Sequence, residues 1–81
     1  MNILVIDDEE NIREIISDIL TDENYSVFTA PDGPTGLEYF IKEKIDICLL
    51  DVWMPKMGGI DVLKKIKENY PDTDVVMISG H

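Results

Sequence analysis

Short apolar runs alternate along the chain with segments whose apolar residues recur at helical spacing. Residues 2–6 form a brief run rich in β-branched side chains, which favours a strand over a helix. The next segment has apolar residues at i, i+3, i+4, i+7 and i+8, the pattern of one helix face. These residues are Ile12, Ile15, Ile16, Ile19 and Leu20. The chain is therefore predicted to begin with a strand and an amphipathic helix.

The same alternation continues to the end of the chain. We expect strands at 25–30, 46–50 and 74–78, a second helix after the turn at 31–34, and a third helix over about 60–69. The residues expected to face inward on the second and third helices are Leu37, Phe40, Ile41, Val62, Leu63 and Ile66. The order β-α-β-α-β-α-β predicts an α/β fold with one parallel sheet, because each helix crosses over to the next parallel strand.

The net charge of the chain argues against two classes of binding partner, nucleic acids and anionic membranes. The chain has 17 acidic and 7 basic residues and a formal net charge of -10, which repels DNA phosphates and anionic lipid head groups. We therefore expect no direct binding to nucleic acid and no membrane association, and no apolar run approaches the roughly 20 residues that span a bilayer. The start has no basic leader, and Cys48 is the only cysteine, so an intrachain disulfide is excluded. These features favour the cytoplasm.

Acidic residues collect where the predicted strands end. Asp7 and Asp8 follow the first strand, Asp51 follows the third, and Ser79 follows the fourth. Ligands bind beyond the carboxyl ends of parallel strands, so these side chains are expected to converge. Two bare carboxylates at about 4 Å repel by roughly 4 kcal/mol at an effective dielectric of about 20, and Mg2+ would offset that repulsion. Helix capping is the alternative for a single acid, but it does not explain all three.

Motifs for other chemistries are missing from the sequence. It contains no G-x-x-x-x-G-K-[ST] and no G-x-G-x-x-G loop, which argues against mononucleotide and dinucleotide sites. One histidine and one cysteine cannot form a structural zinc site, and no nucleophile elbow is present. A carboxylate near Mg2+ that attacks a phosphoryl group remains the simplest chemistry.

Three motifs resemble those of the receiver domain of bacterial response regulators, and the likeness runs from Ile3 to the last residue. IDDEENIRE resembles the family's paired acidic motif, LLDVWMPKMGG the loop around the phosphoacceptor, and MISGH the end of the fourth strand. The SGH ending is similar to receivers of the NtrC type, which precede an ATPase and a DNA-binding module. The resemblance implies a flavodoxin-like, doubly wound parallel sheet of order 2-1-3-4-5, of which this chain holds four strands.

The resemblance also implies a role for each motif residue. Asp51 would accept a phosphoryl group from a sensor histidine kinase of a two-component system, with Mg2+ as the cofactor. Asp8 would bind Mg2+ directly, Asp7 directly or through water, and the backbone carbonyl of Trp53 would be a further ligand. Ser79 would be the switch hydroxyl that hydrogen-bonds the phosphoryl group. The domain would be a phosphoacceptor and not an enzyme, with at most weak autophosphatase activity.

The chain departs from the family pattern in one loop and in length. Gly58 stands where the family often has Asp or Asn. The family continues with a helix, a strand and a helix that carry a phosphate-pairing lysine, so residues 1–81 are expected to be the N-terminal part of a single receiver domain. An output module outside these residues would regulate transcription. With the fourth strand as an exposed edge, we expect a homo-oligomer or a domain-exchanged dimer.

The residues alone leave two other functions open. One is a receiver-like chain that acts only as a metal-binding or self-associating interaction module. The other is an aspartyl-phosphate hydrolase of the haloacid dehalogenase type, which also places a nucleophilic aspartate after a parallel strand. That second class needs another aspartate two residues later, where Trp53 stands.

Overall fold

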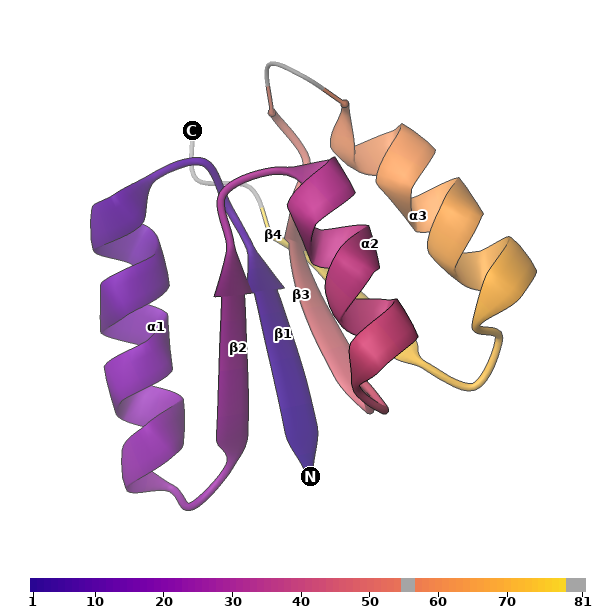
Figure 1. The fold of residues 1–81 in the computed structure, drawn as a ribbon. Coiled ribbons are helices and arrows are strands. Elements are labelled where there is room, and N and C mark those ends of the chain that lie inside the picture. The colour runs from indigo at the N-terminus through magenta and orange to yellow at the C-terminus, as the bar shows by residue number, and fades with distance from the viewer. Residues whose placement is uncertain (55–56, 79–81) are drawn as a thin grey trace.

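A four-stranded parallel sheet with strand order β2-β1-β3-β4 forms the centre of the fold (Figure 1). The computed structural model describes residues 1–54 and 57–78. Strands and helices alternate as predicted, and the flavodoxin-like α/β arrangement is confirmed. The elements are β1 (Asn2–Ile6), α1 (Glu10–Asp22), β2 (Ser26–Ala30), α2 (Gly33–Lys42), β3 (Ile47–Asp51), α3 (Gly59–Asn69) and β4 (Asp74–Ile78).

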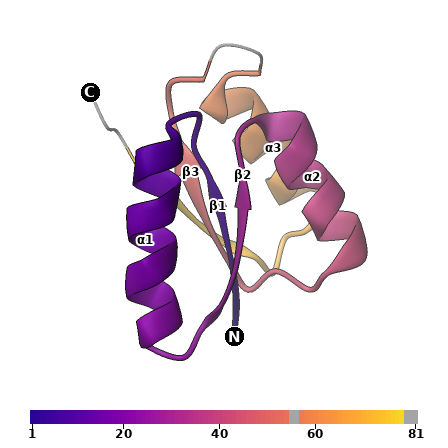
Figure 2. The ribbon, with the colours of Figure 1, turned by 60° about the vertical axis from the view of Figure 1, so that its left-hand side comes forward.

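The helices lie on both faces of the sheet, with α1 on one face and α2 and α3 on the other (Figures 1 and 2). The main core lies between the sheet and the α2–α3 layer. Its buried apolar side chains are Leu4, Ile6, Ala30, Phe40, Ile45, Cys48, Leu50, Met54, Val62 and Ile66. Full burial of a large aliphatic or aromatic side chain contributes about 1.5–3 kcal/mol, so this cluster is the main source of cohesion between the sheet and the two helices.

The α1 helix covers the opposite face less completely. It contains no fully buried residue, and the side chains of Ile15 and Ile19 are 56% and 58% exposed. Ile12 and Ile16 are half-buried, so the stripe that faces the sheet passes through these two positions and leaves the other two isoleucines at its margin. Within the described part of the chain, no helix combines the length and the apolar character needed to cross a membrane.

The prediction that Ile41 faces the core is wrong, because its side chain is 78% exposed. The buried positions of α2 are Gly33, Gly36 and Phe40, which follow i, i+3, i+7 spacing. Ile41 lies about 100° farther round the helix than Phe40 and so falls outside that stripe. A Cβ at Gly36 would overlap the side chain of Ile6, so α2 approaches the sheet through glycines that an apolar pattern does not detect.

The register of the sheet brings the ends of β1 and β3 level at one edge. Ile6, the last residue of β1, pairs with Leu50 of β3. The β3 strand extends one residue beyond the predicted span, so that Asp51 is still paired, with Ile78 of β4. Asp7 follows Ile6 directly. The backbone therefore places Asp7 and Asp51 next to each other at the carboxyl edge before any side-chain interaction is considered.

The first residue of α3, Gly59, lies against the backbone at the end of β3. Its N–H donates to the Val52 carbonyl oxygen at 3.1 Å. A Cβ at Gly59 would overlap the Asp51 carbonyl oxygen and lie 2.8 Å from Val52 Cα. At Gly58, φ is -59° and the nearest atom that a Cβ would meet is Asp61 Oδ2 at 3.9 Å. A glycine is therefore needed at 59, whereas 58 has room for a side chain.

This difference makes the two adjacent glycines a matched pair for mutation. Gly59→Ala should lower the free energy of unfolding by about 1–3 kcal/mol, because α3 must move away from β3. Gly58→Ala should change it by less than about 1 kcal/mol, because its backbone conformation suits alanine. Urea unfolding followed by circular dichroism measures both values. Equal losses in the two variants would contradict the close approach at Gly59.

Candidate metal centre

Three carboxylates meet at the carboxyl edge of the sheet. Asp7 follows β1, Asp8 is the next residue of the loop, and Asp51 ends β3. One oxygen atom from each lies within 4.8 Å of the other two. Asp7 and Asp51 are 4% and 1% exposed, whereas Asp8 is open to solvent. The predicted convergence of these acids is confirmed.

Asp7 is held by hydrogen bonds at its amide, its side chain and its carbonyl. Its N–H donates to the Ala30 carbonyl oxygen of β2 at 3.1 Å. Its Oδ1 accepts from the Glu9 N–H at 2.9 Å, and its carbonyl oxygen accepts from Arg13 Nη1 at 2.7 Å. The last bond has a charged donor and is therefore among the stronger kind. Together they anchor the short loop between β1 and α1 on which Asp8 lies.

In the described part of the chain, Asp51 has a hydrogen-bond partner at only one of its two carboxylate oxygens. Its Oδ1 accepts from the Trp53 N–H at 3.1 Å. Its Oδ2 is buried and has no hydrogen-bond partner among the described residues. An unpaired buried acceptor costs about 1–3 kcal/mol, and more when it is charged. Of the three acids, Asp51 is thus the one with a buried oxygen that no described residue bonds.

The protein alone disfavours the ionised form of Asp51. Burial raises the pKa of Asp51, the Trp53 N–H opposes that rise, and the carboxylates of Asp7 and Asp8 raise the pKa further. A hard divalent cation would give the free oxygen a partner and neutralise the cluster. Mg2+ prefers a few carboxylate or carbonyl oxygens and keeps several waters, so two buried acids and one exposed acid suit it.

The remaining predicted site residues are described to different extents. The Trp53 backbone adjoins Asp51 through its N–H, and its side chain is 64% exposed. Its carbonyl as a metal ligand stays a prediction. Ser79, predicted to be the switch hydroxyl, lies outside the described residues.

Sequence reasoning missed the contact that Arg13 makes with Asp7. Arg13 is the only arginine of the chain and is separated by two residues from a run of four acids, at 7–10. An isolated cation beside such a run was the available signal. Its target could not be deduced, because the bond goes to a backbone carbonyl and not to a carboxylate.

Comparison with known proteins gives a consistent result. The family model described as response regulator receiver domain matches residues 3–81. The transcriptional regulatory protein DltR of Streptococcus agalactiae is 40% identical over 80 residues, which are 99% of this chain and 36% of that protein. The nitrogen assimilation regulatory protein NtrX of Azorhizobium caulinodans is 38% identical over 82 residues, which are 99% of this chain and 18% of that protein. The chain therefore spans about a third or less of these relatives.

Solved structures agree with this result. The response regulator TrrA of Thermotoga maritima, in complex with Mg2+ and BeF, is 34% identical, with a TM-score of 0.92. That match covers 99% of this chain and 70% of TrrA. A second structure contains TrrA with the histidine kinase ThkA and matches with a TM-score of 0.90 at 34% identity, over 98% of this chain and 68% of that chain.

The family match leaves out only the first two residues, and solved proteins of the same kind follow the same backbone course at more than 30% identity. None of the relatives and structures named above is a haloacid dehalogenase. The chain belongs to the response regulator receiver domain family of two-component systems.

Proposed function

We propose that Asp51 is the phosphoacceptor of this receiver domain and that Mg2+ binds beside it. The observation that carries the proposal is the buried Oδ2 of Asp51, which lies within a cluster of three acids and has no hydrogen-bond partner in residues 1–54 and 57–78. A structural aspartate with the same burial would normally have a donor at both oxygens. An unpaired oxygen at the carboxyl edge of a parallel sheet is instead suited to a ligand.

The metal ligands in this proposal are Asp8, Asp7 directly or through water, Asp51 and the Trp53 carbonyl. Mg2+, when bound, would neutralise the carboxylates and polarise the phosphoryl oxygens. The role of the chain is to hold the acceptor: the Trp53 N–H fixes Oδ1 of Asp51, and the paired end of β3 fixes its backbone. The hydrogen bonds from the Glu9 N–H and from Arg13 keep Asp7 in place without a metal.

The transfer itself would join a carboxylate oxygen of Asp51 to phosphorus while the bond from phosphorus to a histidine nitrogen breaks. The product is an acyl phosphate, and the imidazole leaves as the neutral base after it gains a proton. The donor would be a sensor histidine kinase, as the complex of TrrA with ThkA suggests by similarity. Ser79 would hydrogen-bond the phosphoryl group, and hydrolysis by the domain itself would be weak at most.

Residues 1–81 would be the N-terminal part of one receiver domain in a larger cytoplasmic regulator. The relatives named above are transcriptional and nitrogen assimilation regulators, which supports an output in transcription through a module outside these residues. One form of that proposal is an NtrC-type output, in which an ATPase and a DNA-binding module follow the receiver.

A second property is proposed for the 81-residue polypeptide by itself, namely self-association through β4. This strand pairs with β3 on one side, and no strand among residues 1–54 and 57–78 pairs with its other side. Val76 is 49% exposed on it, and the strand is apolar except for Asp74. An apolar edge strand is a template for pairing with another chain.

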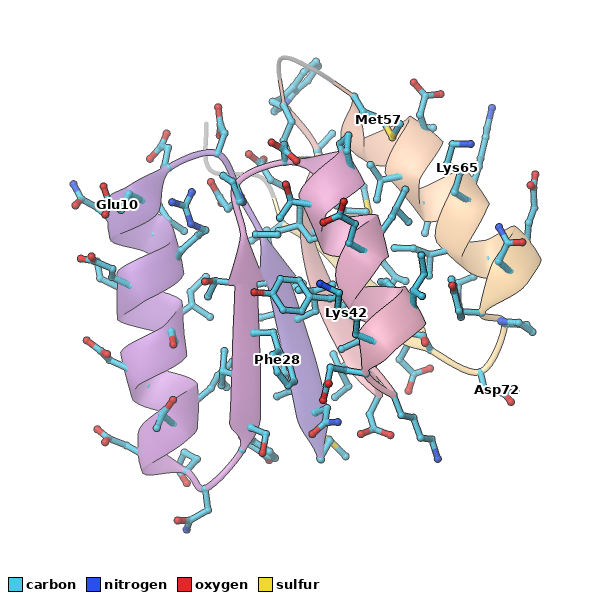
Figure 3. All side chains as sticks on the ribbon, in the orientation of Figure 1. Glu10, Phe28, Lys42, Met57, Lys65 and Asp72 are labelled. Atoms are coloured by element: carbon cyan, nitrogen blue, oxygen red, sulfur yellow. The ribbon has the colours of Figure 1, made fainter. Side chains whose placement is uncertain are left out.

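Phosphorylation can be tested directly with a small donor. The chain incubated with acetyl phosphate and Mg2+ should gain the mass of one phosphoryl group, and hydroxylamine should remove it. Asp51→Asn should abolish the adduct, and Asp8→Asn should reduce it by about 10-fold or more at limiting Mg2+. Asp72→Asn is the control, because Asp72 is exposed and lies far from the acidic cluster. In Figure 3 the position of Glu10, two residues after Asp8, marks the cluster's side of the molecule. An adduct retained in Asp51→Asn, read by intact mass spectrometry, would refute the assignment.

Asp51→Asn should also stabilise the metal-free protein, by about 1–3 kcal/mol at neutral pH. The folded-state pKa of Asp51 lies above its ordinary value of 3.8, so its ionised form costs folding free energy. This cost is fully present above the raised pKa and disappears as pH falls to the ordinary value. The gain should therefore vanish near pH 3.8. Urea unfolding in EDTA across this pH range measures it, and a gain that grows as pH falls would contradict burial of the ionised carboxylate as the cause.

Self-association is tested by sedimentation equilibrium of the 81-residue chain. The weight-average mass should rise with protein concentration, and Val76→Lys should reduce that rise because a charge on an edge strand opposes pairing. Ile41→Lys is the control, since Ile41 is also exposed but lies on α2. A monomer at every concentration would refute this property and leave the assignment of Asp51 unaffected.

A further inference from the structure

The side chain of Arg13 reaches back from the first turns of α1 to the end of β1. Its Nη1 donates to the Asp7 carbonyl oxygen at 2.7 Å, across six residues of sequence. The backbone N–H of Arg13 donates to the Glu9 carbonyl oxygen at 3.1 Å. One residue therefore binds the loop at both of its ends, at Asp7 through the side chain and at Glu9 through the backbone.

The Asp7 carbonyl belongs to the peptide group that leads into Asp8. A hydrogen bond to that oxygen fixes the plane of the peptide, and this plane together with φ of Asp8 sets the direction in which the Asp8 side chain leaves the backbone. Asp8 is exposed, so packing does little to fix its position. The orientation of this acid toward Asp51 thus depends on the peptide that Arg13 holds.

Carboxylates lie in the same groove as Arg13, yet its guanidinium bonds to the backbone. Arg13 lines a surface groove between α1 and β2 together with Glu10, Glu14 and Asp18, which offer carboxylates nearby. Its guanidinium nevertheless donates to a main-chain carbonyl beside the acidic cluster.

We propose that Arg13 is a positioning residue, which orients the Asp7–Asp8 peptide so that Asp8 can serve as a metal ligand. The inference rests on the Mg2+ site proposed above. Arg13 touches neither the metal nor the phosphoryl group in this proposal, and it acts through the backbone. Second-layer partners that orient metal ligands typically change metal affinity by about 10–100-fold when they are removed.

The test compares the wild type with Arg13→Gln, Arg13→Lys and Lys42→Gln by isothermal titration with Mg2+. Lys42→Gln makes the same change in charge at the end of α2, on the other face of the sheet (Figure 3). Arg13→Gln should weaken Mg2+ binding by about 10-fold or more, and Arg13→Lys should restore part of the loss. Lys42→Gln should change the affinity by less than about 2-fold, because its charge is distant and screened.

A second readout needs no metal. Amide hydrogen exchange in EDTA reports the Glu9 N–H, which donates to Asp7 Oδ1. In Arg13→Gln this amide should exchange faster by about 10-fold relative to wild type, while amides of β3 should be unchanged. The result would show that the loop has loosened in a chain that is otherwise folded.

Each other outcome overturns the inference at a different step. Equal affinity losses in Arg13→Gln and Lys42→Gln would mean that only long-range charge acts. A lower unfolding midpoint with unchanged affinity would mean that Arg13 is a structural link. A wild type that binds no Mg2+ would remove the metal site and this inference with it, whereas normal binding in both wild type and Arg13→Gln would remove only the role of Arg13.

Discussion

Repulsion among three carboxylates at one edge of the sheet is the constraint on which the rest of this structure depends. The strands β1 and β3 are neighbours that end level, so Asp7 and Asp51 cannot separate without breaking the sheet. Both are almost fully buried, and water can therefore screen their charges only weakly. The apolar contacts of Leu4, Ile6 and Leu50 hold the strands in this register. Packing energy in the core thus maintains an arrangement of charge that is unfavourable on its own.

Hydrogen bonds give the three acids different degrees of freedom. Asp7 is fixed at three positions, by its own loop, by α1 and by β2. Asp51 is bonded at one oxygen, and no described residue bonds the other. Asp8 is in contact with solvent. Such a site is rigid on its protein side and open on its solvent side. A cation and its waters can enter it with little rearrangement of the buried acids.

The sequence was sufficient for the order of elements and for the convergence of the acids, for a physical reason. Buried parallel strands are continuous apolar runs, and their carboxyl ends must meet at one edge, so acids that follow such runs are brought together. Gly59 and Gly36 show what the apolar pattern does not contain. They mark close approaches between elements, and these depend on packing in three dimensions.

Two residues show other limits of sequence reasoning. Ile41 fits the helical period as well as Phe40 does, but a short helix has one stripe, and the buried glycines decide where it lies. The target of Arg13 is a backbone oxygen, which every residue has, so no side-chain pattern could identify it. The role of Ser79 stays a prediction, because this residue lies outside the part of the chain that the structure describes.

The position of Trp53 has a consequence for how the site can be observed. It is the only tryptophan of the chain, its backbone N–H donates to Asp51 Oδ1, and its side chain is mostly in solvent. The excited state of an indole is sensitive to its surroundings, so selectively excited tryptophan emission comes from one residue, whose backbone is bonded to Asp51. A bound cation and an added phosphoryl group would change the charge beside this backbone in opposite directions. The unmodified protein therefore carries its own optical label at the one place where its charge is expected to change.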